Sequence, residues 1–191
     1  AGNMETSYST STFTFDNTGP TTAITNPINN SLLNSLTSIE GTASDATSPI
    51  KKVQVSIARY DGTKYWNGSI WISTTTAQWV DVTDLNPWHY DSLPDWNSEG
   101  PKYKLRARGI DEVDNIGEPS SEVVFTFDNT PPDSTILLPE DGKTYRTLGT
   151  ISGTASDEVS GVDKVEIRIF DMSDQDYYQG GGVWGSTATY V

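Results

Sequence analysis

Phe13-Thr14-Phe15-Asp16-Asn17-Thr18 occurs a second time, residue for residue, as Phe125-Thr126-Phe127-Asp128-Asn129-Thr130. The second copy begins 112 positions after the first (125 − 13). Further blocks keep this offset, and they pair 41–45 with 153–157, Pro27 with Pro139, and 52–57 with 164–169. Several matching blocks in one order and at one spacing indicate a tandem array of similar domains.

The repeat also predicts where the domains begin and end. Residues 1–18 correspond to 113–130, so we interpret them as the tail of a preceding repeat. One complete repeat spans 19–130, and 131–191 form the first part of the next. A partial sandwich exposes an apolar face and unpaired strand edges. We therefore infer either an excerpt of a longer array or units that a neighbouring chain completes.

Apolar side chains in the complete repeat alternate with polar ones, which is the pattern of a strand with one buried face. Val53, Val55 and Ile57 alternate with Gln54 and Ser56. The same alternation places Tyr103, Leu105, Ala107, Val123, Phe125 and Phe127 on inward faces. Turn dipeptides separate these runs, and no segment shows a helical apolar stripe. About seven strands in roughly 110 residues predict an all-β fold of tandem immunoglobulin-like β-sandwiches, one complete unit flanked by partial units.

Composition narrows the classes of partner. The chain has 191 residues, a formal net charge of −14 and no cysteine. The negative charge disfavours nucleic acids and anionic membranes as partners, and it favours cations. Without cysteine there are no disulfides, no cysteine-based zinc sites and no thiol chemistry. No apolar run approaches the roughly 18 residues of a membrane span, so we predict no membrane contact from this segment.

Several motifs resemble the tandem repeats of bacterial immunoglobulin-like domains in large exported surface proteins. They are Phe-Thr-Phe-Asp-Asn-Thr-Pro-Pro at 125–132, Pro139, Ile-Ser-Gly-Thr-Ala-Ser-Asp at 151–157, Ser-Gly-Val-Asp-Lys-Val-Glu-Ile at 160–167 and Trp-Asn-Gly at 66–68. The resemblance covers almost the whole chain. It implies an extracellular or cell-surface location, in a surface protein, an adhesin or an appendage of a secreted enzyme.

Acidic and amide side chains gather in loops that immunoglobulin topology brings to one end of a sandwich. The candidate metal ligands are Asp16, Asn17, Asp45, Asp111 and Asp114 at the first junction between repeats, and Asp128 and Asp157 at the second. Calcium takes six to eight oxygen ligands, and an ion there would stiffen the joint. The alternative is that Asp and Asn serve the turns through local backbone hydrogen bonds. We favour this alternative because the spacing is not that of an EF-hand.

Tryptophans are the second candidate site. Trp66 and Trp71 lie on a predicted hairpin, and exposed indoles are flat platforms on which sugar rings stack. A small sandwich also depends on a few large side chains to fill its core. We favour packing over a ligand surface for these two residues.

Signals of an enzyme are weak, and we predict no catalytic activity. His89 is the single histidine, and its neighbours Asp91 and Ser92 are too close in sequence to assemble a proton relay with it. The chain has no nucleophile-elbow motif, no phosphate-binding glycine loop and no pair of histidines at metal spacing. The basic residues from Lys102 to Arg108 alternate with apolar ones, which favours a solvated strand face over a polyanion site.

These observations predict a non-enzymatic structural or spacer module of an extracellular surface protein or filament. Its partners would be adjacent repeats of the same chain or copies of itself in a fibre. It requires no cofactor, and calcium is the candidate ion. The alternative is an adhesive or carbohydrate-binding module of a secreted adhesin or enzyme, whose partner would be a surface glycan or protein.

Overall fold

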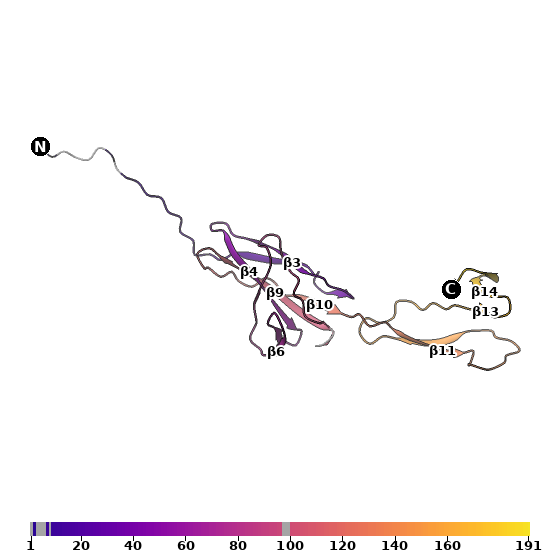
Figure 1. The fold of residues 1–191 in the computed structure, drawn as a ribbon. Helices are drawn as coiled ribbons and strands as arrows, with labels where there is room; N and C mark the ends of the chain where they lie inside the picture. The colour runs from indigo at the N-terminus through magenta and orange to yellow at the C-terminus, as the bar shows by residue number, and fades with distance from the viewer. Residues whose placement is uncertain (1, 3–6, 8, 97–99) are drawn as a thin grey trace. The chain divides into compact units, whose positions relative to one another are not determined.

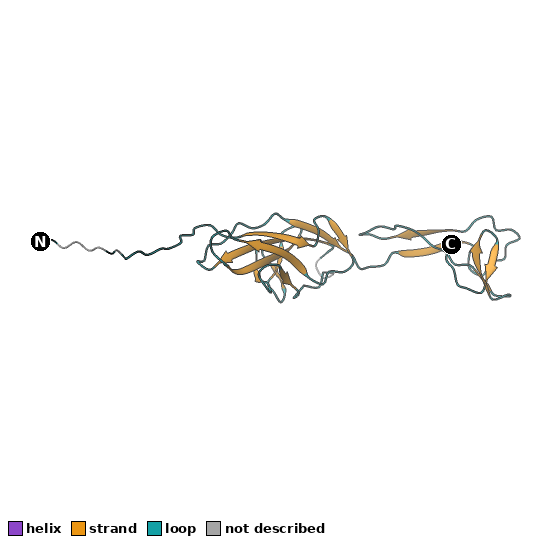
Figure 2. Cartoon of the chain, turned by 90° about the horizontal axis from the view of Figure 1, so that it is seen from above, coloured by secondary structure: helices purple, strands orange, loops and turns teal. Residues whose placement is uncertain are grey.

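The computed structural model describes residues 2, 7, 9–96 and 100–191, and within them it contains strands and loops but no helix (Figure 2). The prediction of an all-β chain is therefore confirmed. In particular, this part of the chain has no helix with the length and apolar character needed to cross a membrane. The chain divides into two compact units, Ala1–Asn129 and Thr130–Val191, whose strands can be followed by colour in Figure 1.

The first unit is built of two sheets. The smaller sheet has the order β1-β3-β8, with β1 at Thr21–Asn26, β3 at Ile39–Ser44 and β8 at Trp88–Tyr90. The larger sheet has the order β2-β10-β9-β4-β5-β6, with β2 at Ser31–Leu33, β10 at Val123–Phe127, β9 at Lys102–Asp111, β4 at Ile50–Arg59, β5 at Lys64–Trp66 and β6 at Trp71–Ser73. A short strand, β7 (Val80–Asp81), also pairs with β4. The inner faces of the two sheets form one core, as in a β-sandwich.

The register of β9 positions the loops at one end of this sandwich. β9 pairs antiparallel with β4, from Ile50 opposite Asp111 to Arg59 opposite Tyr103. On its other side it pairs antiparallel with β10, which β2 joins in parallel. The last residue of β9 therefore lies beside the loop that connects β3 to β4.

Period-two alternation explains the core. Val53, Val55 and Ile57 are at most 1% exposed, and Tyr103, Leu105 and Phe125 are fully buried, so the predicted inward faces are confirmed. Trp88 of β8 is fully buried as well. Gly41 of β3 packs directly against it, because a Cβ at this position would collide with the Trp88 ring and with the Ala23 carbonyl. A small residue is therefore required where β3 passes under the indole.

The second unit repeats the first part of this arrangement. Its strands are β11 (Asp133–Leu138), β12 (Ser152–Ser156), β13 (Phe170–Asp171), β14 (Asp176–Gly180) and β15 (Val183–Gly185). β11 pairs with β12 as β1 pairs with β3, down to the same register shift, which falls at Ile24/Asn26 and at Ile136/Leu138. These two strand pairs therefore fold alike. Other matching segments do not, because 125–127 and 52–57 lie in strands whereas 13–15 and 164–169 do not.

Apolar side chains that the first unit buries are exposed in the second. Val53 is 1% exposed, whereas its equivalent Val165 is 61% exposed, and Ile136 is 65% exposed. In the first unit β9 pairs with the strand that carries Val53. The described part of the second unit has no counterpart of β9.

Candidate functional site

Three carboxylates meet where the segment before β1 enters the first unit. One oxygen from each of Asp16, Asp45 and Asp111 lies within 4.8 Å of the others. Asp45 directly follows β3, and Asp111 is the last residue of β9. The structure thus brings together three of the residues that the sequence suggested as metal ligands at the first junction.

A serine hydroxyl connects two of these carboxylates. Ser48 Oγ lies 2.6 Å from Asp16 Oδ2 and 2.7 Å from Asp111 Oδ2. A hydroxyl carries one hydrogen, so Ser48 donates to one carboxylate at a time. Ser48 is not among the candidate ligands that the sequence suggested. The repeat held a signal for it, since Ser160 occupies the equivalent position 112 residues later (160 − 48).

Asp111 is fully buried, and both of its carboxylate oxygens accept hydrogen bonds. Its Oδ1 accepts hydrogen bonds from the backbone N–H groups of Val113 and Asn115, at 3.0 and 2.8 Å. Its Oδ2 accepts one from Asn115 Nδ2 at 2.8 Å. Burial raises the pKa of the Asp111 carboxyl, but the hydrogen bonds from Ser48 and Asn115 outweigh burial and hold the pKa below its usual value.

Asp16 is tied to the same loops through its side chain and its backbone. When Ser48 donates to Asp16 instead of Asp111, this hydrogen bond, followed by that from the Thr18 backbone, lowers the pKa of the Asp16 carboxyl. Asn115 Nδ2 also lies 3.3 Å from the Asp16 carbonyl oxygen. These contacts hold the entering segment against the ends of two strands that are far apart in sequence.

Pro20 completes this connection by packing. It is fully buried, and Gly117 lies so close to it that a Cβ on the glycine would collide with the Pro20 carbonyl oxygen. We name the set formed by Asp16, Pro20, Ser48, Asp111 and Asn115 the junction clasp. It joins the segment before β1 to the loops after β3 and β9.

The remaining candidate ligands lie elsewhere. Asn17 is exposed, and Asp114 pairs with Lys51 Nζ at 2.6 Å. Asp128 is buried at the end of β10 in the first unit. In the second unit, Asp157 Oδ1 accepts hydrogen bonds from the backbone of Val159, Ser160 and Gly161, and these bonds lower its pKa. Asp157 thus closes its own turn.

Calcium binding at the clasp stays a prediction. Asp45 Oδ1 accepts hydrogen bonds from the backbone of Thr47 and Ser48, at 2.8 and 2.9 Å. Asp16 and Asp111 are engaged as described above, so each carboxylate has a local partner of the kind that suits a turn. Calcium would add carboxylate coordination to this network.

Both candidate tryptophans are held in the core of the first unit. Trp66 is 9% exposed, and its Nε1 donates a hydrogen bond to the Tyr90 hydroxyl at 3.0 Å. Trp71 is half-buried and stacks on Tyr103, with 5.7 Å between ring centroids. The two indoles meet edge to face at 5.9 Å. These contacts are those of packing side chains, the role that the sequence favoured for both residues.

His89 lies on β8, at the edge of the smaller sheet. Its Nδ1 is 3.4 Å from Asp84 Oδ2, and its Nε2 is 3.5 Å from Asp91 Oδ2. Each ring nitrogen therefore lies beside a carboxylate that is close to it in sequence.

Comparisons relate this architecture to known proteins. Residues 20–94 match the family model of the bacterial Ig domain, the family that the sequence resembles. The chain is similar to the solved fibronectin(III)-like modules of CbhA from Clostridium thermocellum, at 16% identity and a TM-score of 0.38, covering 56% of this chain and 96% of that one. It is also similar to an engineered protein, at 13% identity and a TM-score of 0.36, covering 57% of this chain and 20% of that one. No curated protein matches it.

Bacterial Ig-like domains are generally non-catalytic, are common in extracellular or surface proteins, and act as structural or binding modules.

Proposed function

We propose that the protein is a non-enzymatic spacer in an extracellular surface protein or filament built of Ig-like repeats. The junction clasp is the observation that carries this proposal. A flexible tether needs no contacts with the domain that follows it, whereas this segment is hydrogen-bonded and packed onto the unit that it enters. Fixing the approach to each unit limits bending between repeats, and limited bending sets the reach of an array.

Adjacent repeats of the same chain, or copies of the chain in a fibre, are the proposed partners. The exposed apolar side chains of the second unit support this, because their equivalents in the first unit are covered by further strands. Strand addition to an open sheet edge is the physical basis for such a contact.

The clasp is tested by the backbone dynamics of residues 16–20 in the full chain. We expect NMR order parameters near 0.85 for the amides of residues 16–19, since Pro20 has no N–H, and a fall below about 0.6 when Ser48→Ala and Asn115→Ala are combined. Ser69→Ala, in the turn between β5 and β6, is the matched control and leaves them unchanged. Order parameters below 0.6 in the wild-type chain would overturn the spacer proposal.

The same measurement addresses the calcium prediction. A bound ion would hold the three carboxylates together, so chelation is expected to loosen residues 16–20 and to lower the melting temperature. Identical dynamics and melting curves with calcium and with chelator would exclude calcium from the junction while leaving the hydrogen-bonded clasp in place.

A further inference from the structure

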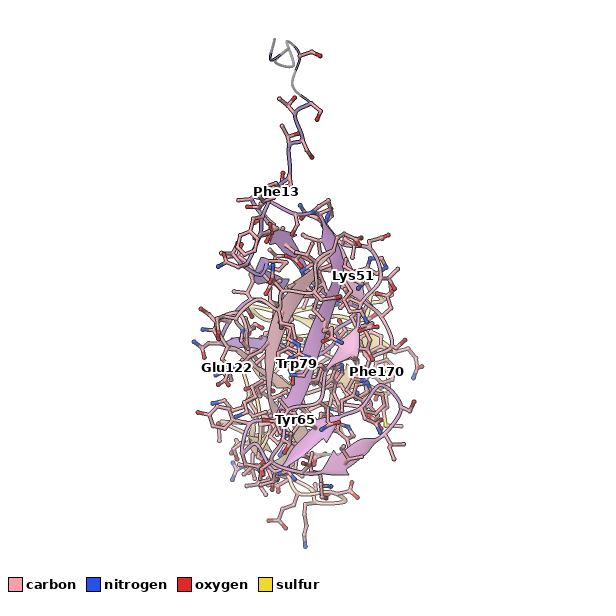
Figure 3. The ribbon with its side chains drawn as sticks, turned by 90° about the vertical axis from the view of Figure 1, so that its left-hand side faces the viewer. Phe13, Lys51, Tyr65, Trp79, Glu122 and Phe170 are labelled. Atoms are coloured by element: carbon pink, nitrogen blue, oxygen red, sulfur yellow. The ribbon has the colours of Figure 1, made fainter. Side chains whose placement is uncertain are left out.

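The outer face of the larger sheet carries a hollow of about 280 Å³ in the first unit. Ser56 and Ala58 of β4 form its floor, and both are small enough to leave room above the strand. Tyr65 and Trp79 stand on one side, while Lys104, Arg106, Pro119 and Glu122 line the rest. Figure 3 shows Trp79 and Tyr65 in front of the sheet, with Glu122 to one side.

Trp79 is held in place as an aromatic wall of this hollow. The guanidinium carbon of Arg108 lies 4.2 Å from the centroid of its ring. Arg108 is itself fixed by Gln54 Oε1, which accepts from its Nε at 2.9 Å and from a terminal nitrogen at 2.8 Å. The ring is half-buried and also lines a second hollow beside the first. It is therefore a preorganised platform rather than a mobile surface side chain.

Positive charge is concentrated on the same face. Lys102, Lys104, Arg106 and Arg108 alternate along β9 and account for four of the 12 basic residues of the chain. Lys104 and Arg106 share one carboxylate, that of Glu122, at 3.9 and 3.4 Å. The hollow thus has a surplus of positive charge, although the chain as a whole carries −14.

We propose that this hollow binds an acidic polysaccharide, with one uronate residue against Trp79 and its carboxylate between Lys104 and Arg106. A sugar ring needs an apolar platform beside hydrogen-bond donors and acceptors, and Trp79, Ser56 and Glu122 provide them. A guanidinium recognises a carboxylate through paired N–H donors. This hollow shares no residue with the junction clasp, so binding there does not depend on the spacer role.

Nucleic acid and acidic peptide fit the hollow less well. Nucleic acid carries one charge per roughly 1.7 Å of duplex, a density that the two cations of the hollow, already shared with Glu122, do not match. Acidic side chains of a peptide would pair with Lys104 and Arg106, but Asp and Glu have no sugar ring to stack on the indole of Trp79.

Isothermal titration of the full chain with pentagalacturonate tests the proposal. We expect Trp79→Ala and Arg106→Gln each to weaken binding by about tenfold or more. Lys51→Gln, which removes one charge outside the hollow, is the matched control and leaves the affinity unchanged. Trp79→Phe keeps an aromatic platform and is expected to retain most of the affinity. If Trp79→Ala fails to fold, the affinity of Arg106→Gln for pentagalacturonate tests the proposal instead.

Two further ligands separate the contribution of the sugar rings from the contribution of the carboxylate charge. Maltopentaose, which is neutral, and pentaglutamate, which has charge without sugar rings, are each expected to bind at least about tenfold more weakly than pentagalacturonate. Absence of pentagalacturonate binding, equal binding of pentaglutamate, or an equal loss in Lys51→Gln would each overturn the proposal.

Discussion

Asp111 combines complete burial with a carboxylate that stays ionised. Isolated buried carboxylates usually take up a proton, because burial penalises the charged form. Here the donors of Ser48, Val113 and Asn115 surround both oxygens, and the pKa is lowered instead of raised. The charge is thus tolerated because the loop after β9 is folded around it.

The lowered pKa of Asp111 makes its contribution depend on pH. An unfolded aspartate titrates near pH 3.9, and the folded carboxyl titrates lower, so its stabilisation is complete above about pH 5 and is lost as the pH falls through the folded pKa. We expect Asp111→Ala to lower the melting temperature by roughly 5 °C or more at pH 7, and by clearly less at pH 3.

The variant Glu118→Ala is the control, because it removes a carboxylate from an exposed site. Its melting temperature is compared with that of the wild-type chain at pH 7 and at pH 3. This variant is expected to melt like the wild-type chain at both pH values. A gap between wild type and Asp111→Ala that stays constant from pH 7 to pH 3 would show that the ionised form contributes nothing.

At the scale of elements, the hairpin of β5 and β6 closes one side of the core with two indoles. Trp66 and Trp71 pair with each other across this hairpin and contact Tyr90 and Tyr103 from other strands. The short strands are thus held by side-chain packing, since so few ladder bonds are available to them.

Truncation of these indoles separates packing from ligand binding. We expect Trp66→Ala to lower the free energy of unfolding by about 3–5 kcal/mol, the usual cost of deleting a buried indole. Trp79→Ala should cost no more than about 1 kcal/mol, because it removes one partly exposed cation–π contact. Denaturant unfolding measures both, and a Trp66→Ala chain as stable as the wild type would contradict the core placement.

Sequence patterns predicted the long strands well and the tertiary contacts poorly. β9 and β10 follow from strict alternation, since each buries alternate residues along its length. β4 departs from it, because Ser56 and Ala58 are buried as well as Val55 and Ile57. The parallel pairing of β2 with β10 leaves no local signal, because a three-residue strand carries no clear period.

Ser48 was missed for a related reason. Its role depends on the approach of Asp16 and Asp111, which the chain separates by many residues.

Over the whole molecule, the two units differ in how much apolar surface they bury. The first has two sheets and a single core, whereas the second has a two-stranded and a three-stranded sheet with exposed Ile136 and Val165. Small sheets with little burial are marginally stable. The first unit should therefore dominate cooperative unfolding.

Calorimetry tests this difference between the units. Unfolding of roughly 110 residues near 60 °C absorbs about 75 kcal/mol, against about 130 kcal/mol for all 191 residues. We expect the main transition of the full chain to match the smaller value. A single transition with the larger enthalpy would show that both units unfold together.

The parallel pairing of β2 with β10 matters when opposite ends of the first unit are pulled apart. β2 lies near the start of the unit and β10 at its end, in register from Ser31 opposite Phe125 to Leu33 opposite Phe127. Backbone bonds join them from Asn30 to Val124 and from Asp128 to Leu33. Tension draws parallel neighbours past each other along their axes, so these bonds are sheared together instead of being unzipped singly. Rupture then requires breaking them at once, which suits a module that transmits force along a string of domains.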